Sequence, residues 1–337
     1  MTDGEAGGSA GAARETVGRA VRECLKVKRE STRASTARRY EELARRYLLP
    51  AFGELPLSAL SGAKIRKEVS GWLSGDAPGL EAPLSRSTVR QAVVLLRNSL
   101  DLAVEDGLLP ANPVSGVSRQ FRLCSRKKAA GGPQEVYYVP AREVEEILSQ
   151  LKRERPRLHP LFLTLHRAGL RLGEARALQW DDLDFSPRTR SIHVQRTFSK
   201  GGKLEPPKGG TPRVVDMSQQ LAQALFALRE KAPAKAPWVF TTRTGTPFGE
   251  RNLERDWKLT LQSAGLPERY RIHDLRHSFA IEVLRQGKNL VYVRDQLGHS
   301  DIQVTANFYG RYTRLRDLSA VDALDALARQ GEYAFRR

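Results

Sequence analysis

Two arginines, two histidines and one tyrosine stand at spacings that suit chemistry on a phosphodiester. Arg171 lies in Gly-Leu-Arg-Leu-Gly-Glu, and His273 and Arg276 share the segment His-Asp-Leu-Arg-His. His299 ends Leu-Gly-His, and Tyr309 follows ten residues later in Asn-Phe-Tyr-Gly-Arg. Arginine offers a planar fork of donors that matches phosphate oxygens and stays charged. Imidazole exchanges a proton near neutral pH, and a phenol becomes a nucleophile once it loses its proton.

The ordered set Arg…Lys…His-x-x-Arg…His…Tyr, headed by Ala-Gly-Leu-Arg-Leu-Gly-Glu-Ala-Arg, resembles the tyrosine recombinase (phage integrase) family. The resemblance covers residues 139 to about 325. It implies a site-specific DNA recombinase that cleaves and rejoins strands through a covalent 3'-phosphotyrosine intermediate during DNA integration, excision or recombination. A catalytically idle DNA-binding regulator of the same fold and a DNA-relaxing enzyme like the type IB topoisomerases are the alternatives.

The resemblance implies a role for each residue of the set. Arg171 and Arg276 would donate to the non-bridging oxygens of the scissile phosphate, where negative charge spreads in the transition state. Tyr309 would be the nucleophile, and Tyr312, three residues on, is the alternative. The phosphotyrosine would conserve the energy of the phosphodiester bond. No cofactor is therefore expected, and the sequence has no Gly-x-x-x-x-Gly-Lys loop.

We predict a different role for each of the three histidines in this region. His273 would accept the proton of the tyrosine or hold the phosphate, and His299 would donate to a non-bridging oxygen. His277 lies four residues after His273, a spacing that on a helix can bind metal. Because no third ligand lies at a suggestive spacing, we predict no metal site and a packed or supporting role for His277.

The leaving sugar oxygen needs a proton, and in the resembled family a lysine of a β-hairpin provides it. Lys208 in Pro-Pro-Lys-Gly-Gly-Thr-Pro-Arg best matches that place, and Lys200 and Lys203 of the same turn region are alternatives. Neighbouring cations lower the pKa of a lysine and so suit it to this task. Glu174 follows Arg171 by three residues, which on a helix makes them neighbours, so we expect Glu174 to orient a catalytic arginine or histidine.

The charge of the chain favours a polyanionic partner. The 337 residues carry a net charge of +18 with a pI near 10.2, and double-stranded DNA is the commonest partner of such a protein. No long apolar run or basic amphipathic anchor indicates a membrane. Cys24 and Cys124 are too few for a disulfide framework, so we expect a DNA-associated protein of the bacterial cytoplasm.

The periodicity of apolar residues predicts a mainly α protein with a small antiparallel β element. Strands are expected at Ser191 to Thr197 and Arg213 to Met217, and one N-terminal helix is expected to start at Ser35-Thr36 and end at Pro50. The predicted domains are a disordered tail (1–12), a helical DNA-binding domain like the core-binding, SAM-like domain of the family (13–117), a basic linker (118–138), a mixed catalytic domain with a C-terminal tail helix (139–325) and a tail (326–337).

Two segments outside the catalytic set are expected to bind partners. The linker cations would follow the DNA backbone, and they are Arg119, Arg122, Arg126, Lys127 and Lys128. The apolar residues from Leu315 to Leu327 form an amphipathic pattern that we expect to dock on a neighbouring subunit. The resemblance implies a homo-oligomer on DNA, a tetramer in the synaptic complex, with an accessory DNA-bending protein as a further candidate partner.

Overall fold

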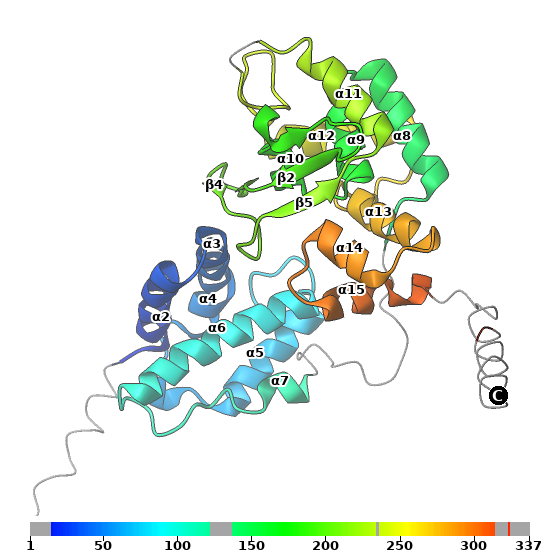
Figure 1. The fold of residues 1–337 in the computed structure, drawn as a ribbon. Coiled ribbons are helices and arrows are strands. Elements are labelled where there is room, and N and C mark those ends of the chain that lie inside the picture. Colours follow the sequence, from blue (N-terminus) through cyan, green and yellow to red (C-terminus); the bar gives the residue numbers. More distant parts are fainter. Residues whose placement is uncertain (1–14, 122–136, 234–235, 314–322, 324–337) are drawn as a thin grey trace, which may run out of the picture. The chain divides into compact units, whose positions relative to one another are not determined.

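The computed structural model describes residues 15–121, 137–233, 236–313 and residue 323, in two compact units, Met1–Gly131 and Gly132–Arg337 (Figure 1). Three predictions concern residues outside this range. They are the disordered N-terminal tail, the amphipathic helix with the tail after it, and the linker cations Arg122, Arg126, Lys127 and Lys128. The fifth linker cation, Arg119, lies in a short helix, α7 (Val117–Gln120).

The regular elements that the structure describes in the first unit are all helices, as predicted. Its longest helix, α6, packs against α2, α3 and α5 (Figure 1). Thr16, Ser61 and Ser85 cap α2, α5 and α6 by accepting hydrogen bonds from backbone N–H groups of the first turn. The helices are α2 (Val17–Ser31), α3 (Ala34–Leu43), α4 (Leu49–Phe52), α5 (Gly62–Ser74), α6 (Arg86–Glu105) and α7.

The predicted helix from Ser35 to Pro50 has different ends in the structure. Helix α3 begins at Ala34, and a π-helical turn (Ala44–Leu48) continues it into α4, which contains Pro50 in its first turn. A proline breaks an α-helix because it lacks an N–H and crowds the carbonyl four residues before it. The wider π-helical turn precedes Pro50 at that point, so the chain stays helical to Phe52.

The second unit combines helices with two small antiparallel sheets, which confirms the predicted fold class. Strand β2 (Ser191–Val194) lies between β1 (Leu183–Asp184) and β5 (Arg213–Asp216), and β3 (Thr197–Phe198) pairs with β4 (Leu204–Glu205). The helices are α8 (Ala141–Glu154), α9 (His159–Arg167), α10 (Leu172–Arg176), α11 (Gln219–Arg229), α12 (Glu250–Ser263), α13 (Asp274–Arg285), α14 (Leu290–Leu297) and α15 (Ile302–Tyr309).

The predicted strand from Ser191 to Thr197 is divided between the two sheets. The β2–β5 ladder pairs Ile192 with Val215 and Val194 with Arg213, and Thr197 already belongs to β3. Ile192, Val194 and Val215 are buried in the core. The register therefore places Arg213 at the start of β5, directly after the turn region that contains Lys208.

The core of the second unit holds the start of α13 in place. Phe162 of α9 stacks on Trp257 of α12 with 5.3 Å between ring centroids, and Trp257 Nε1 donates to the Tyr270 carbonyl at 2.7 Å. Ser278 Oγ donates to the Val139 carbonyl at 2.8 Å from within α13. These contacts position the helix that contains Arg276 and His277 and has His273 as its N-cap.

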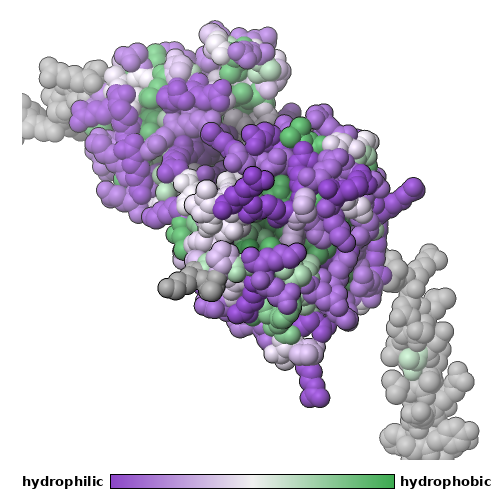
Figure 2. All heavy atoms as spheres, turned by 90° about the horizontal axis from the view of Figure 1, so that it is seen from above, coloured by the Kyte–Doolittle hydropathy of each residue, from purple (hydrophilic) through white to green (hydrophobic). Residues whose placement is uncertain are grey.

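Most of the molecular surface in view is hydrophilic, with hydrophobic residues in small groups (Figure 2). This distribution agrees with the charge of the chain, in which 56 lysines and arginines outnumber 38 acidic residues. No helix among the described residues is long and apolar enough to cross a membrane.

Candidate active site

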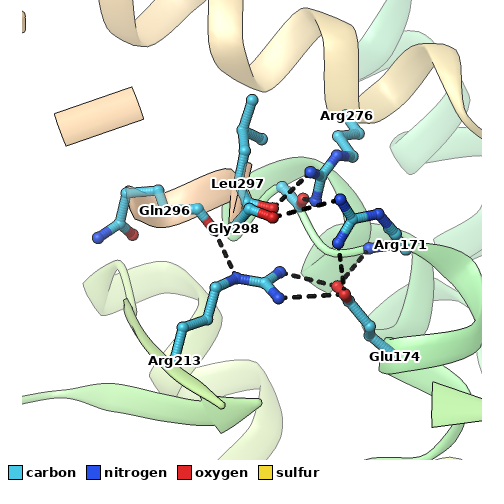
Figure 3. A network of polar contacts seen from close by, with 8 residues as sticks. Arg171, Glu174, Arg213, Arg276, Gln296, Leu297 and Gly298 are labelled. Carbon is cyan, nitrogen blue, oxygen red and sulfur yellow. Dashed lines mark hydrogen bonds and ion pairs between the residues drawn. The ribbon is translucent and has the colours of Figure 1, made fainter. Parts of the chain in front are cut away.

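Arg276 is buried at the centre of the site, with 2% of its surface exposed. Its Nη1 donates to the Gly169 carbonyl at 2.7 Å, and its Nη2 donates to the Leu297 carbonyl at 2.5 Å (Figure 3). These bonds join the loop before α10 and the end of α14 to the first turn of α13. Burial and the nearby charge of Arg171 lower the pKa of Arg276 from its ordinary value.

Arg171 lies at the N-cap position of α10, and it is tied to Glu174 twice. Its backbone N–H donates to Glu174 Oε2 at 3.0 Å, and its Nη1 donates to Oε1 at 2.8 Å. Its Nη2 lies 3.5 Å from the Gly298 carbonyl and so points toward the same loop as Arg276 (Figure 3). The structure thus brings the two predicted phosphate-binding arginines together.

Glu174 has a second partner, Arg213, which is not among the site residues predicted from the sequence. Arg213 Nη1 and Nη2 donate to the two carboxylate oxygens at 3.1 and 2.7 Å, and its Nε donates to the Gln296 carbonyl at 3.0 Å (Figure 3). Burial alone would raise the pKa of Glu174, but Arg213, Arg276 and Arg171 lower it to about 2. The only sequence signal for Arg213 was an arginine that opens a predicted strand.

The backbone at Gly298 needs a glycine for two reasons. Its φ of 64° is left-handed, and an added Cβ would lie 2.7 Å from Arg213 Cδ. The left-handed residue ends α14 and turns the chain so that His299 follows directly. The Leu-Gly-His motif therefore has a structural explanation.

Tyr309 is the last residue of α15, and 1% of its surface is exposed. Its hydroxyl lies 2.6 Å from Nδ1 of His277. Burial raises the pKa of Tyr309 to about 12, against the opposing influence of the positive charges of Arg276 and Arg171. The predicted nucleophile is thus in the electrostatic field of both arginines and keeps its proton at neutral pH.

His273 and His299 are uncharged at neutral pH. Loss of hydration, with His277 and Arg276 nearby, lowers the pKa of His273 to about 4, although the residue reaches the surface. Burial and the charges of Arg276, Arg171 and Arg213 lower the pKa of His299 to about 3. His299 Nδ1 also lies 2.9 Å from the Thr305 hydroxyl, which fixes the orientation of its ring.

The candidate lysines lie on turns next to the site. Lys208 is exposed in a turn closed by the Gly210 N–H donating to the Pro207 carbonyl at 2.8 Å, and it lines one hollow together with His299. Lys200 lines another hollow with His273, and Lys203 is exposed at the end of the same β3–β4 turn. The turn that contains Lys208 leads directly into Arg213, and the side chain of Arg213 binds Glu174.

The alternative nucleophile, Tyr312, has different neighbours. Its ring packs edge-on against Tyr138 with 6.1 Å between centroids, and the Arg285 guanidinium lies 5.8 Å from its centroid. Among the described residues no group of three His, Cys, Asp or Glu side chains is placed to hold a metal ion.

Taken together, the geometry suits attack of a phenol oxygen on a phosphorus. Two guanidinium groups converge on one loop, two neutral imidazoles flank them, and a tyrosine hydroxyl contacts a third imidazole. Such fixed donors stabilise the charge of a phosphoryl-transfer transition state.

Comparison with known proteins identifies two family matches in the chain. Residues 138–316 match the model of the phage integrase family, and residues 20–73 match that of the phage integrase N-terminal SAM-like domain. The XerC-like tyrosine recombinase of Caldanaerobacter subterraneus subsp. tengcongensis is 30% identical over 72% of this chain and 67% of its own length. The tyrosine recombinase XerC of Halalkalibacterium halodurans is 30% identical over 71% and 76%.

Solved structures with a similar fold include two integrases. The Tn1549 transposon integrase in complex with a circular intermediate DNA has a TM-score of 0.74 at 19% identity, over 92% of this chain and 99% of that chain. A lambda integrase tetramer bound to a Holliday junction has a TM-score of 0.65 at 14% identity, over 87% of this chain and 79% of that chain.

Proposed function

The chain belongs to the phage integrase family and is a tyrosine-type site-specific recombinase, and we propose that Tyr309 cleaves and rejoins DNA through a covalent 3'-phosphotyrosine. The observation that carries this assignment is the position of the Tyr309 hydroxyl, which lies in the field of Arg171 and Arg276 and contacts His277. A phenol needs such a neighbouring base to become a nucleophile.

In the proposed reaction the scissile phosphate binds between Arg171 and Arg276. Their donors neutralise the non-bridging oxygens, while His273 and His299, both uncharged, donate N–H groups to them. Glu174 and Arg213 keep Arg171 and the Leu-Gly-His loop in register. As the bond from Tyr309 Oη to phosphorus forms, the bond from phosphorus to the 5' sugar oxygen breaks.

Lys208 is the proposed donor of a proton to the leaving sugar oxygen. It lines the hollow that also contains His299, and its two following glycines allow the turn to move toward a bound strand. Lys200 lines another hollow together with His273, and substitutions of Lys200 and Lys208 should be compared. A Lys208 variant should cleave slowly, but a substrate with a sulfur leaving group should restore its rate.

The proposed partner is double-stranded DNA, in keeping with a net charge of +18. The lambda integrase tetramer on a Holliday junction is the model for the proposed assembly of four protomers on two sites. We place the protein in the cytoplasm, associated with DNA, and an accessory DNA-bending protein would serve to bring the sites together. The proposed DNA-contacting strap consists of Arg119, Arg122, Arg126, Lys127 and Lys128.

A covalent-trap experiment tests the function. Nicked duplexes from the DNA that flanks the gene are incubated without magnesium with the wild type, Tyr309→Phe and Tyr312→Phe, then separated under denaturing conditions. We expect an adduct with the wild type and Tyr312→Phe and none with Tyr309→Phe.

Each other outcome would support a different nucleophile or a different activity. An adduct with the wild type and Tyr309→Phe, but none with Tyr312→Phe, would make Tyr312 the nucleophile. Tight binding without any adduct across a library of sites would favour a DNA-binding regulator. Relaxation of supercoiled DNA without joining of two marked sites would favour a topoisomerase.

A further inference from the structure

His277 makes a contact that its predicted supporting role does not explain. Its Nδ1 lies 2.6 Å from the hydroxyl of Tyr309, which is short for a hydrogen bond between a ring nitrogen and a phenol. The ring of His273 packs edge-on against the ring of His277, with 5.0 Å between centroids. Of the two histidines, His273 is the N-cap of α13, and His277, within α13, is the one that contacts the proposed nucleophile.

On the basis of the function proposed above, we propose that His277 is the catalytic residue that removes the proton from Tyr309 during strand cleavage. The proton passes from Tyr309 Oη to His277 Nδ1 as the Oη–phosphorus bond forms. The phosphorus–5' oxygen bond breaks, and Lys208 gives a proton to the departing oxygen. In rejoining, the sugar hydroxyl returns its proton to the Lys208 amine and the imidazolium returns its proton to Tyr309, so both steps balance.

The protonation states of Tyr309 and His277 suit this proton transfer. Burial raises the pKa of Tyr309 to about 12, so the hydroxyl needs a base at neutral pH. Burial lowers the pKa of His277, and Arg276 and Arg271 lower it further while Asp274 opposes them. His277 is therefore uncharged and can accept a proton. Only 1% of the surface of Tyr309 is exposed, so water has almost no access to its hydroxyl. His277 is in direct contact with that hydroxyl and is therefore the available proton acceptor.

The position of His277 in helix α13 supports the same assignment. His277 follows Arg276 directly, so the proton acceptor and the central phosphate-binding arginine belong to one helical turn. Ser278, the next residue, is fully buried and anchors the turn through hydrogen bonds to the carbonyls of Val139 and Asp274. A base on such a rigid element keeps its distance from the phosphate.

Single-turnover cleavage of a nicked duplex tests the proposal, with DNA affinity and thermal unfolding measured in parallel. His277→Asn keeps an acceptor near the position of Nδ1 but cannot take the proton. His273→Asn, at the N-cap of the same helix, instead alters a proposed phosphate donor and is the variant for comparison. We expect His277→Asn to lower the rate of adduct formation by about 10²- to 10⁴-fold with DNA affinity unchanged. Free imidazole at constant ionic strength should restore part of the rate in His277→Ala and not in His273→Ala.

The pH profile provides a second readout that a structural role would not change. A base that must be neutral gives a wild-type rate that rises with pH through a midpoint below 6.5, and His277→Asn should lose this rise. Two results would overturn the proposal. One is that free imidazole restores the rate of His273→Ala and not that of His277→Ala. The other is a His277→Asn rate within about threefold of the wild type, since loss of a catalytic base usually has a far larger effect. Absence of an adduct with the wild type, or an adduct in Tyr309→Phe, would instead contradict the proposed function.

Discussion

At the scale of single residues, the central feature is a carboxylate shared by two arginines. The side chain of Glu174 is fully buried, and Arg171 and Arg213 bind its two oxygens. Removing one partner of a buried ion pair costs about 3–5 kcal/mol because the other charge is left uncompensated. Glu174→Gln leaves three arginines around a neutral amide, so we expect a loss of unfolding free energy within this range, measured by urea denaturation at pH 7.

The same carboxylate gives a pH dependence whose sign is set by its lowered pKa. The folded pKa is about 2, below the ordinary value of 4.5, so the carboxylate stabilises the fold fully above pH 4.5. This contribution, about 3 kcal/mol, is lost as the pH falls from 4.5 toward 2. The difference in unfolding free energy between wild type and Glu174→Gln should be constant between pH 5 and 7. A difference that grows on acidification would contradict this account.

Substitution of Arg213 tests whether its contacts with Glu174 and Gln296 affect the rate of cleavage by positioning the predicted catalytic residues. Arg213→Lys keeps the charge but loses the bidentate contact with Glu174 and the bond to the Gln296 carbonyl. We expect adduct formation to slow by about tenfold to a hundredfold at saturating DNA, with affinity nearly unchanged, because small displacements of reacting groups are costly. Lys288→Arg serves as a control substitution outside the network. An equal loss of affinity and rate would show that Arg213 acts in binding.

At the scale of elements, the turn after α14 depends on one glycine. Gly298→Ala would force a side chain into the left-handed region and place its Cβ 2.7 Å from Arg213 Cδ. Gly287 after α13 has a φ of 83° with no atom within 4 Å of an added Cβ, so Gly287→Ala carries the backbone cost alone, about 1–2 kcal/mol. We expect Gly298→Ala to lower the melting temperature more than Gly287→Ala and also to slow cleavage. Equal shifts in the two variants would remove the role of the contact with Arg213.

At the scale of the whole molecule, the charge of the chain predicts how DNA binding responds to salt. Each phosphate contact that a linker cation makes contributes about 0.9 to the slope of log affinity against log salt concentration. Replacing Arg122, Arg126, Lys127 and Lys128 with glutamine should weaken binding to all sequences and reduce this slope, as fluorescence anisotropy can measure. Lys231→Gln removes one charge outside the linker and is the control for each of the four substitutions made singly. An unchanged slope would exclude contacts between these linker cations and the DNA phosphates.

The sequence by itself determined the family, the mainly helical fold and the order of the predicted catalytic residues. Motif spacing and apolar periodicity are local properties, and they located α13, β5 and the Leu-Gly-His turn to within a residue or two. They did not predict that Pro50 lies inside a helix, because a π-helical turn has no simple periodic signal.

Only the tertiary structure decided which side chains are partners. The Glu174–Arg213 pair joins residues on α10 and β5, and the His277–Tyr309 contact joins α13 to α15. Such contacts depend on how helices and strands pack, which spacing along the chain does not encode. The sequence therefore predicted a supporting role for His277, and its contact with the proposed nucleophile, Tyr309, depends on the packing of two helices.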